Sequence, residues 1–462
     1  MKEYKTIIIG AGVAGLGCGY ELANSGHKPL ILEKGSLIGG LAQTPQYKGY
    51  RFDIGGHRFY TKIPEIQQLW ERILGESLTT VQRLSRIYYY HQYFSYPISA
   101  PEVIQKLGLV EALRILGSYL KSKVNPPQIE SLEDYIIANF GERLYQLFFK
   151  GYTQKVWGRA CSEISAEWGQ QRIKGLSLGE VISKALGFKS NAKSLIEEFY
   201  YPKLGCGQMY EVMGEKIVSM GGEIKLGVEV EHIYIEDNRV VGVLADGLPI
   251  ECDHLVSSMP LSTLLQVMDG TPQQVIESAQ QLQYRDFLVV CLILNKPDIF
   301  PDNWIYVHND NVAVGRIQNY RNWSTSMIPD DNTTCLGMEY FCDRDSGLWN
   351  TEDKALVYIA SIELQSLGLA NYSDVIDGFV FRQPLAYPVY GNNYQHHIQV
   401  IRQYLNMIPN LQTIGRNGLH RYNNMDHSML TGLISARNIL GRDGGDVWEV
   451  NTERSYYETF EK

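Results

Sequence analysis

The first 33 residues contain the feature that most constrains how this chain can fold. A short apolar run at residues 5–9 leads into a G-x-G-x-x-G motif at residues 10–15. A helix-compatible stretch follows, Gly26 ends it, and a second apolar run stops at Glu33. Strand, glycine turn, helix, strand and acid stand in the order that a dinucleotide-binding βαβ unit requires. The sequence therefore predicts a Rossmann-like domain built from this segment.

Each part of this unit has a physical role in holding a dinucleotide. Gly10 permits the tight turn after the strand, Gly12 lets the backbone approach a pyrophosphate, and Gly15 lets the helix pack closely on the sheet. The helix N-terminus offers free N–H groups and a positive dipole end to phosphates. Glu33 can accept hydrogen bonds from ribose hydroxyls. The alternative is a structural βαβ unit without a cofactor, which the agreement of so many parts disfavours.

Length and composition exclude several classes of protein. A chain of 462 residues is too long for one simple core, so two or three domains are expected. The net charge of −9 and the lack of a basic run argue against a nucleic-acid partner. Seven scattered cysteines without a C-x-x-C pair predict neither disulfides nor a metal site, and they suit a cytoplasmic protein. No apolar stretch reaches the roughly 18 residues of a transmembrane helix, so no membrane span is expected.

A glycine pair after Glu33 bears on the choice of cofactor. The segment Ile38-Gly39-Gly40-Leu41-Ala42 resembles the one that follows the acid in FAD-dependent flavoproteins of the amine oxidase, protoporphyrinogen oxidase and UDP-galactopyranose mutase group. In that group the glycine pair lies near the FAD pyrophosphate and ribityl chain. The resemblance therefore implies that the cofactor is FAD and not NAD.

Two further segments extend the resemblance toward the flavin ring. Gly55-Gly56-His57 is similar to the mutase Gly-Gly-His loop, which implies that His57 lies against the flavin and supports it. Residues 415–426 resemble the mutase signature G-R-x-x-x-Y-x-Y-x-x-M-D, which implies that Arg416 lies near the flavin and Asp426 near the ribityl and pyrophosphate region. The cofactor contacts implied in this way are Gly10, Gly12, Ala14, Gly15, Glu33, Lys34, Gly40, Leu41, Gly56, His57, Val230, Arg416, Met425 and Asp426.

Other segments resemble the mutase motifs that bind a UDP-sugar. Residues 151–158 are similar to Y-T-x-K-x-W-G, whose aromatic residues hold the uracil, and stacking on Trp157 would contribute about 1–3 kcal/mol. Arg172 and Arg285 lie in segments that resemble the arginine motifs gripping the diphosphate. The resemblance thus implies catalytic roles for His57, Arg172 and Arg285, and substrate contacts from Tyr152, Trp157, Arg172, Arg285, Tyr387 and Tyr422. Without the resemblance, Trp157 is better explained by a packed aromatic cluster and the arginines by surface ion pairs.

The predicted fold class is α/β: a Rossmann-like FAD-binding domain with a helical insert domain and an antiparallel-sheet substrate domain. Residues 1–75, 200–270 and 405–462 are expected to form the FAD-binding domain. Residues 76–199 are expected to form the helical insert, and residues 271–404, which open on a continuous apolar strand near 287–294, the antiparallel-sheet domain.

The leading functional hypothesis is a mutase that interconverts the pyranose and furanose forms of a nucleotide sugar, a UDP-sugar being favoured. The resemblance implies a covalent adduct between flavin N5 and the sugar, within polysaccharide biosynthesis, and a homodimer is one assembly considered. The chain departs from the mutases at Val314-Gly315-Arg316-Ile317-Gln318-Asn319, where they have Y-T-R-I-x-E. An FAD-dependent oxidase or desaturase for a sugar-related or polycyclic substrate therefore stays open, as does an FAD-bearing binding protein without turnover.

Overall fold

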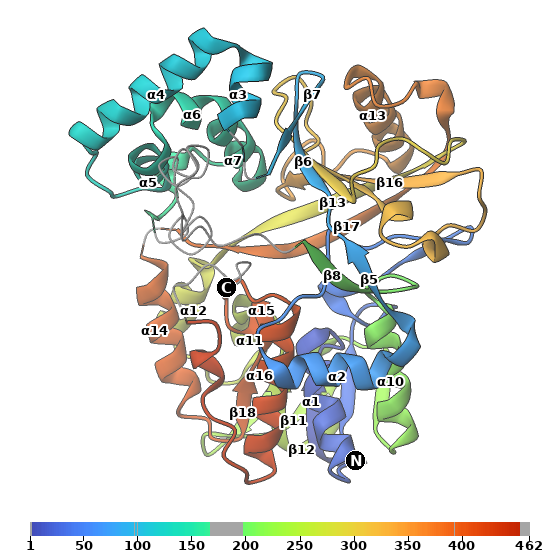
Figure 1. The fold of residues 1–462 in the computed structure, drawn as a ribbon. Helices are drawn as coiled ribbons and strands as arrows, with labels where there is room; N and C mark the ends of the chain where they lie inside the picture. The colour runs from blue at the N-terminus through green and yellow to red at the C-terminus, as the bar shows by residue number, and fades with distance from the viewer. Residues whose placement is uncertain (1, 97, 99, 167–196, 392, 453–462) are drawn as a thin grey trace.

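The computed structural model describes residues 2–96, 98, 100–166, 197–391 and 393–452. They form a mixed, mainly parallel sheet flanked by helices, a second sheet above it, and a group of helices beside the second sheet (Figure 1). The predicted α/β class, with a Rossmann-like part, a helical part and an antiparallel-sheet part, is confirmed. No helix within these ranges is long and apolar enough to cross a membrane.

The first sheet has the strand order β10-β11-β12-β1-β2-β9, with β18 paired to β12. β1 (Lys2–Ile9) runs parallel to β2 (Leu30–Glu33) on one side and to β12 (Leu248–Ser257) on the other. Because successive residues of β1 and β2 are buried on both faces, these central strands are apolar runs in the sequence. The other strands are β9 (Glu223–Leu226), β10 (Val230–Glu236), β11 (Arg239–Ala245) and β18 (Leu411–Thr413).

Helices α1 (Val13–Asn24) and α16 (Met425–Ile439) pack against each other on this sheet. Glycines permit the close approach: a side chain at Gly17 would meet Met429, and one at Gly432 would meet the backbone of Ala14. The two helices therefore begin side by side. This pair contacts α2 (Pro64–Leu74), α10 (Gln208–Ser219) and α15 (Gly415–Gly418), while α11 (Leu261–Val267), α12 (Gln273–Gln280) and α14 (Tyr394–Leu405) pack in series on one another.

The second sheet has the order β17-β13-β16-β15-β14-β6-β7 and is antiparallel except between β14 and β6. Alternate residues of β13 (Gln283–Leu294) serve two cores: Phe287 and Val289 face the core shared with the first sheet, and Leu288 and Val290 face the core under α13 (Asp353–Ser366). β13 pairs with β16 (Thr334–Cys342) and β17 (Val375–Val389), and the sheet continues through β15 (Arg316–Asn319) and β14 (Trp304–Val307).

One part of the predicted domain division is wrong. Residues 78–95, assigned to the helical insert, form β5 (Leu78–Gln82), β6 (Ser85–Tyr89) and β7 (Gln92–Ser95), and the last two extend the second sheet. The β-branched and aromatic residues of this segment favour strands, and β6 finds its partner in β14, more than 200 residues away in sequence. β5 pairs with β8 (Glu198–Pro202). The other domain boundaries stay predictions.

The described helices of the insert begin at Ala100. They are α3 (Ala100–Leu107), α4 (Leu109–Val124), α5 (Leu132–Phe140), α6 (Glu142–Leu144) and α7 (Lys150–Trp157), with a π-helical turn η3 (Tyr145–Phe149) before α7. Ser131 caps α5, because its side chain accepts from the backbone N–H of Asp134 and the Asp134 side chain accepts from that of Ser131.

Candidate functional site

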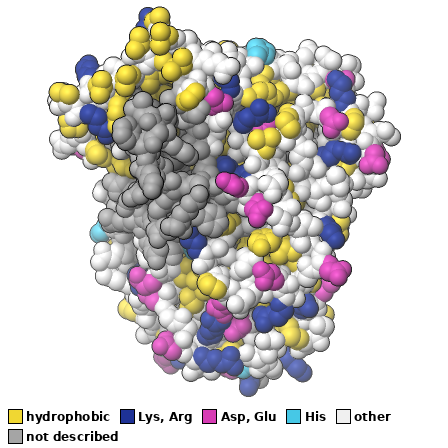
Figure 2. Space-filling view, viewed as in Figure 1, with side chains coloured by type: hydrophobic (Ala, Val, Ile, Leu, Met, Phe, Trp, Pro, Cys, Tyr) yellow, Lys and Arg dark blue, Asp and Glu magenta, His cyan; other side chains and the backbone are white. Residues whose placement is uncertain are grey.

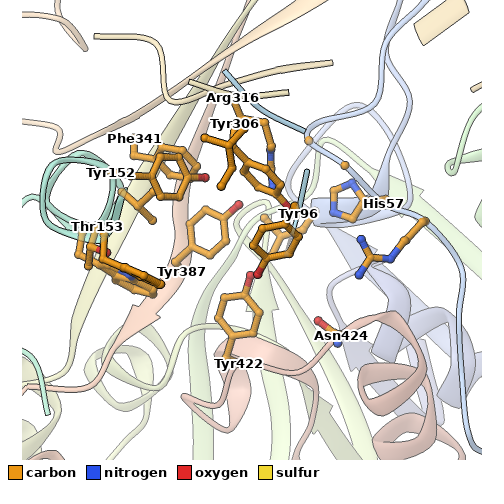
Figure 3. A pocket seen from close by; sticks show the side chains of 18 of the residues that line it. His57, Tyr96, Tyr152, Thr153, Tyr306, Arg316, Phe341, Tyr387, Tyr422 and Asn424 are labelled. Carbon is orange, nitrogen blue, oxygen red and sulfur yellow. The ribbon is translucent and has the colours of Figure 1, made fainter. Parts of the chain in front are cut away.

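A cavity of about 760 Å³ opens at the carboxyl ends of β1 and β2. Its walls come from the glycine turn after β1, the loop at residues 40–60, the second sheet, the insert helices and the segment at residues 415–428 (Figure 3). The carboxyl edge of a parallel sheet is where doubly wound proteins bind their ligands. The described part of the chain thus gathers most of the predicted site residues into one space.

The floor of this cavity beside α1 is bare backbone. Gly12 pairs with Gly39 in an isolated bridge, and the Cα of Gly12 lies 3.0 Å from where a side chain of Gly40 would begin. Gly40 also has a φ of +57°, which disfavours any other residue. A side chain at Gly40 would therefore be both crowded and strained, and the two glycine segments leave a smooth surface that a diphosphate can approach.

Two helix N-termini point at the same surface. Gly12 precedes α1 and Asn424 precedes α16, and neither residue makes a side-chain capping hydrogen bond. The first residues of both helices line the cavity. Their N–H groups and positive dipole ends favour an anion there.

Glu33 lines the cavity at the end of β2. Its carboxylate accepts hydrogen bonds from the N–H of Ala11 at 2.8 Å and the N–H of Gly35 at 2.7 Å. These bonds fix the carboxylate beside the glycine turn, in the position from which an acid receives ribose hydroxyls. The cradle, the two helix ends and Glu33 together fit a dinucleotide.

His57 lines the cavity next to two arginines. Burial, and then the charges of Arg416 and Arg316, lower the pKa of His57 to about 3. Its Nδ1 has no hydrogen-bond partner among the residues that the structure describes. The imidazole is therefore neutral near pH 7, and its Nδ1 is buried without a hydrogen bond in the described part of the chain.

Aromatic rings surround Arg416. The guanidinium lies 4.5 Å from the ring centre of Tyr422, and this ring stacks on that of Tyr387 at 5.7 Å. Trp157 meets Tyr387 edge-on at 6.5 Å (Figure 3 labels both tyrosines). Arg416 donates to the carbonyls of Asn423 at 3.0 Å and Ala386 at 3.1 Å, so its hydrogen bonds in the described part of the chain leave its charge unneutralised.

Arg316 on β15 also lines the cavity and has a different electrostatic state. Its Nε donates to the carboxylate of Glu339, which is fully buried on β16. The amide of Gln318 donates to the other oxygen of Glu339 at 2.9 Å. The buried carboxylate keeps Arg316 charged, its pKa well above the usual range despite the burial, and directs the guanidinium at the cavity.

Asp426 is buried at the start of α16. Burial raises the pKa of its carboxyl to about 7, although the Thr61 hydroxyl opposes this. Near neutral pH the group therefore exists partly as a neutral acid that can donate a hydrogen bond into the cavity.

Most predicted site residues line the cavity. They are Gly10, Gly12, Ala14, Glu33, Gly40, Leu41, Gly56, His57, Tyr152, Trp157, Tyr387, Tyr422, Arg416, Met425 and Asp426. Gly15 instead packs α1 on the sheet, as expected, because a side chain there would overlap the Gly10 carbonyl. Lys34, which pairs with Glu229 at the surface, and Val230, buried at the start of β10, do not line it. Arg172 lies outside the described residues.

The expected catalytic and substrate-binding role of Arg285 is not supported by its position. Its guanidinium pairs with Asp343 and donates to the carbonyls of Val156 at 3.2 Å and Phe341 at 3.0 Å. These contacts tie the end of α7 to β16, and Arg285 is absent from the described cavity lining. The side chain joins two elements and does not reach the ligand space.

Sequence reasoning missed Arg316, Tyr306 and His308 as cavity residues. His308 stacks on Tyr152 at 4.5 Å with nearly parallel rings, and Tyr306 meets Tyr152 edge-on at 5.8 Å. Tyr306 and His308 are two positions apart at the end of β14, so a period-two pattern could have placed them on one face. Arg316 stands in the segment that departs from the mutases, where the arginine and isoleucine are in fact retained.

Fold and cavity define a protein that binds a dinucleotide at the carboxyl edge of a Rossmann-like sheet. Residues 13–440 match the sequence profile of the flavin-containing amine oxidoreductases. The chain belongs to that family, and its cofactor is FAD. The bare glycine floor, the two uncapped helix N-termini and Glu33 are the features that fit this cofactor.

Several known proteins are similar to this chain. A Klebsiella pneumoniae protein named "Probable UDP-galactopyranose mutase" is 29% identical over 36% of this chain and 44% of its own length. The 15-cis-phytoene desaturase of Arabidopsis thaliana is 40% identical over 57% of this chain and 49% of its own length. The matches thus span about half or less of these curated relatives. The crystal structure of a reduced UDP-galactopyranose mutase superposes with a TM-score of 0.83 at 22% identity, covering 98% of this chain and 99% of that one, which shows a shared fold.

Proposed function

We propose that this flavoenzyme is a mutase that interconverts the pyranose and furanose forms of a nucleotide sugar, with a UDP-sugar as substrate. The observation that carries the proposal is the cationic and aromatic end of the cavity. Arg316, Arg416 and the stacked Tyr387 and Tyr422 meet there beside His57. Two guanidinium groups next to tyrosines suit a sugar diphosphate. The likeness to the reduced mutase structure supports the same choice.

Each side chain has a separate task in this proposal. Arg416, whose charge no hydrogen-bonded carboxylate balances within the described residues, binds the diphosphate, and Arg316, held by Glu339, binds it from the second sheet. Both stabilise the negative charge of the diphosphate as the bond to the sugar breaks. Trp157, exposed by only 5%, packs its indole against the base. The neutral His57 supports the flavin through its buried nitrogen.

The reactive centre comes from the cofactor. FAD, when bound and reduced, supplies the nucleophile that such a rearrangement needs, so a side-chain nucleophile is not required. The seven cysteines are all buried, which keeps thiols away from the substrate. The chain itself contributes orientation, charge and exclusion of water.

A second candidate is an FAD-dependent oxidoreductase that acts on an apolar substrate. Apolar side chains of the insert helices line one end of the cavity, and this favours a substrate with few polar groups. The similarity to 15-cis-phytoene desaturase supports the same class. The two functions differ in redox balance: the mutase regenerates reduced flavin in each cycle, and the oxidoreductase consumes an oxidant or reductant.

The test uses FAD-loaded protein with its flavin chemically reduced and air excluded. UDP-galactopyranose is added, and flavin absorbance and sugar products are followed together. Furanose formed while the flavin stays reduced is expected, with no product from oxidised protein. Arg416→Gln is expected to lower kcat/KM at least tenfold, while Arg239→Gln, an exposed strand position outside the cavity lining, serves as the matched control. Failure to bind UDP or to form an isomer would rule out the mutase.

A further inference from the structure

The cavity has a second end whose chemistry differs from that at Arg316 and Arg416. Every described lining residue between positions 98 and 149 is aliphatic or aromatic. Most of these residues belong to α3, α4, α5, α6 and η3. This set of lining residues, from 98 to 149, is named the helical wall below.

Part of the helical wall is open to solvent although it is apolar. Ile104 on α3 is 47% exposed, and Leu109 and Leu113 on α4 are 63% and 58% exposed. Phe148, which lines the same cavity, is 3% exposed, so the wall passes from a buried floor to an open rim. Figure 2 shows hydrophobic side chains gathered over these helices at the upper left of the view. Contiguous exposed apolar surface of this kind marks a place where something binds.

The helical wall selects against polar ligands. It presents no side chain that can donate or accept a hydrogen bond. A base or a sugar placed there would exchange its hydrogen bonds to water for none. An aliphatic chain gives up no hydrogen bond and gains in proportion to the area it buries.

The helical wall is continuous with the cationic end, since both line one cavity. α7 joins them: it follows η3 directly, and its Tyr152 and Trp157 lie between the wall and Tyr387. A molecule can therefore place an aliphatic chain on the wall and an anionic group at Arg416 at the same time.

We propose that the helical wall binds a polyprenyl chain esterified to a diphosphate, so that the cavity accepts lipid-linked as well as nucleotide-linked sugar diphosphates. The sugar and diphosphate end of this inference rests on the proposed function. The chain-binding wall does not. The leaving group in the rearrangement is a diphosphate ester in both cases, so the chemistry at the sugar is unchanged.

The first experiment compares probes that share a diphosphate and differ in chain length. Isopentenyl diphosphate, geranylgeranyl diphosphate below its micelle concentration, and UDP are titrated calorimetrically into the FAD-loaded protein. Each buried CH2 strengthens binding by up to about fourfold. Geranylgeranyl diphosphate is therefore expected to bind at least about a hundredfold more tightly than isopentenyl diphosphate. Equal affinities would overturn the proposal.

The second experiment locates the chain with two substitutions on α4. Leu113→Glu lies in the helical wall, and Leu120→Glu, 54% exposed on the same helix, is outside the lining. Because both positions are open, neither change should unfold the protein, which urea unfolding checks. Leu113→Glu is expected to weaken the binding of geranylgeranyl diphosphate at least tenfold and to leave the binding of UDP unchanged. Leu120→Glu is expected to change neither affinity. An equal loss in both variants would indicate adsorption to α4 and overturn the proposal.

The two proposals fail separately. Chain-length dependence without isomerisation of UDP-galactopyranose would reject the mutase and retain the chain-binding wall. Isomerisation without chain-length dependence would retain the mutase and reject the wall.

Discussion

Two glycines of the first turn, Gly12 and Gly15, should respond in opposite ways to the same added methyl group. At Gly12 a new Cβ meets only the Cα of Gly40 among the described residues, at 3.7 Å, which is an ordinary van der Waals contact. The φ of Gly12 is −81°, which alanine adopts readily. At Gly15 the new Cβ would overlap the carbonyl oxygen of Gly10. Alanine therefore fits the folded chain at the first position and not at the second.

The magnitudes follow from where each methyl group points. Gly12 lines the cavity, so in Gly12→Ala the methyl group crowds the FAD diphosphate. Crowding of this kind costs about 1–3 kcal/mol, which raises the Kd for FAD about 5–150-fold. The stability of the FAD-free protein should change by no more than about 0.5 kcal/mol. Gly15→Ala should lower that stability by about 1–3 kcal/mol, because backbone atoms must move.

The assay pairs an FAD titration of FAD-free protein, followed by flavin fluorescence, with urea unfolding followed by tryptophan fluorescence. Gly12→Ala should raise the Kd for FAD and leave the free energy of unfolding unchanged. Gly15→Ala should lower the free energy of unfolding. If Gly12→Ala binds FAD with the wild-type Kd, the diphosphate does not lie on the glycine floor. If Gly12→Ala is as unstable as Gly15→Ala, the steric argument for the difference is wrong.

Three further predictions concern charge and stacking. Glu339→Gln removes the buried partner of Arg316. It should lower the free energy of unfolding by somewhat less than the about 3–5 kcal/mol of a fully buried pair, since the Arg316 side chain is 19% exposed. Urea unfolding measures this loss of stability, and adding Arg316→Gln to the same chain should recover part of it. Burial raises the pKa of Asp53 to about 6 from 3.8, so the folded state holds an extra proton between about pH 4 and pH 6. The stability of the wild type should therefore fall relative to that of Asp53→Asn as pH rises through this window. A constant difference in unfolding free energy between the two proteins would contradict this prediction. Trp157→Leu should weaken UDP binding by about 1–3 kcal/mol and leave the FAD Kd unchanged, as seen by calorimetry.

The sequence predicted the local parts of this structure well. The βαβ unit could be read from spacing, because a glycine turn and its flanking apolar runs are set by residues close in the chain. The strands at 78–95 were assigned to the wrong part because a strand is defined by its partner, and β6 pairs with β14 far along the chain. The domain that a segment joins depends on contacts with residues far along the chain, and local periodicity gives no information about those contacts.

The two strand arginines show the same limit within the site. Arg285 on β13 and Arg316 on β15 both stand near the start of a strand of the second sheet, and their local sequence does not show where each side chain points. In the fold, Asp343 and two carbonyls hold the first between α7 and β16, while Glu339 directs the second into the cavity. Glu339 lies on β16 and Asp343 directly follows that strand, so the distinction could be made only once the sheet order was known.

The charges of the cavity also explain why His57 is suited to a neutral role. A histidine beside a carboxylate would be protonated near neutral pH, but the charged groups that lower the pKa of His57 are two arginines. Arg316 is balanced by Glu339, whereas the hydrogen bonds of Arg416 in the described part of the chain go to carbonyls. The excess positive charge therefore resides at Arg416, where it attracts an anionic ligand and adds to the burial that keeps the neighbouring imidazole uncharged. Burial and both arginines thus set the protonation state of His57, and Arg416 in addition sets the preference of the cavity for an anion.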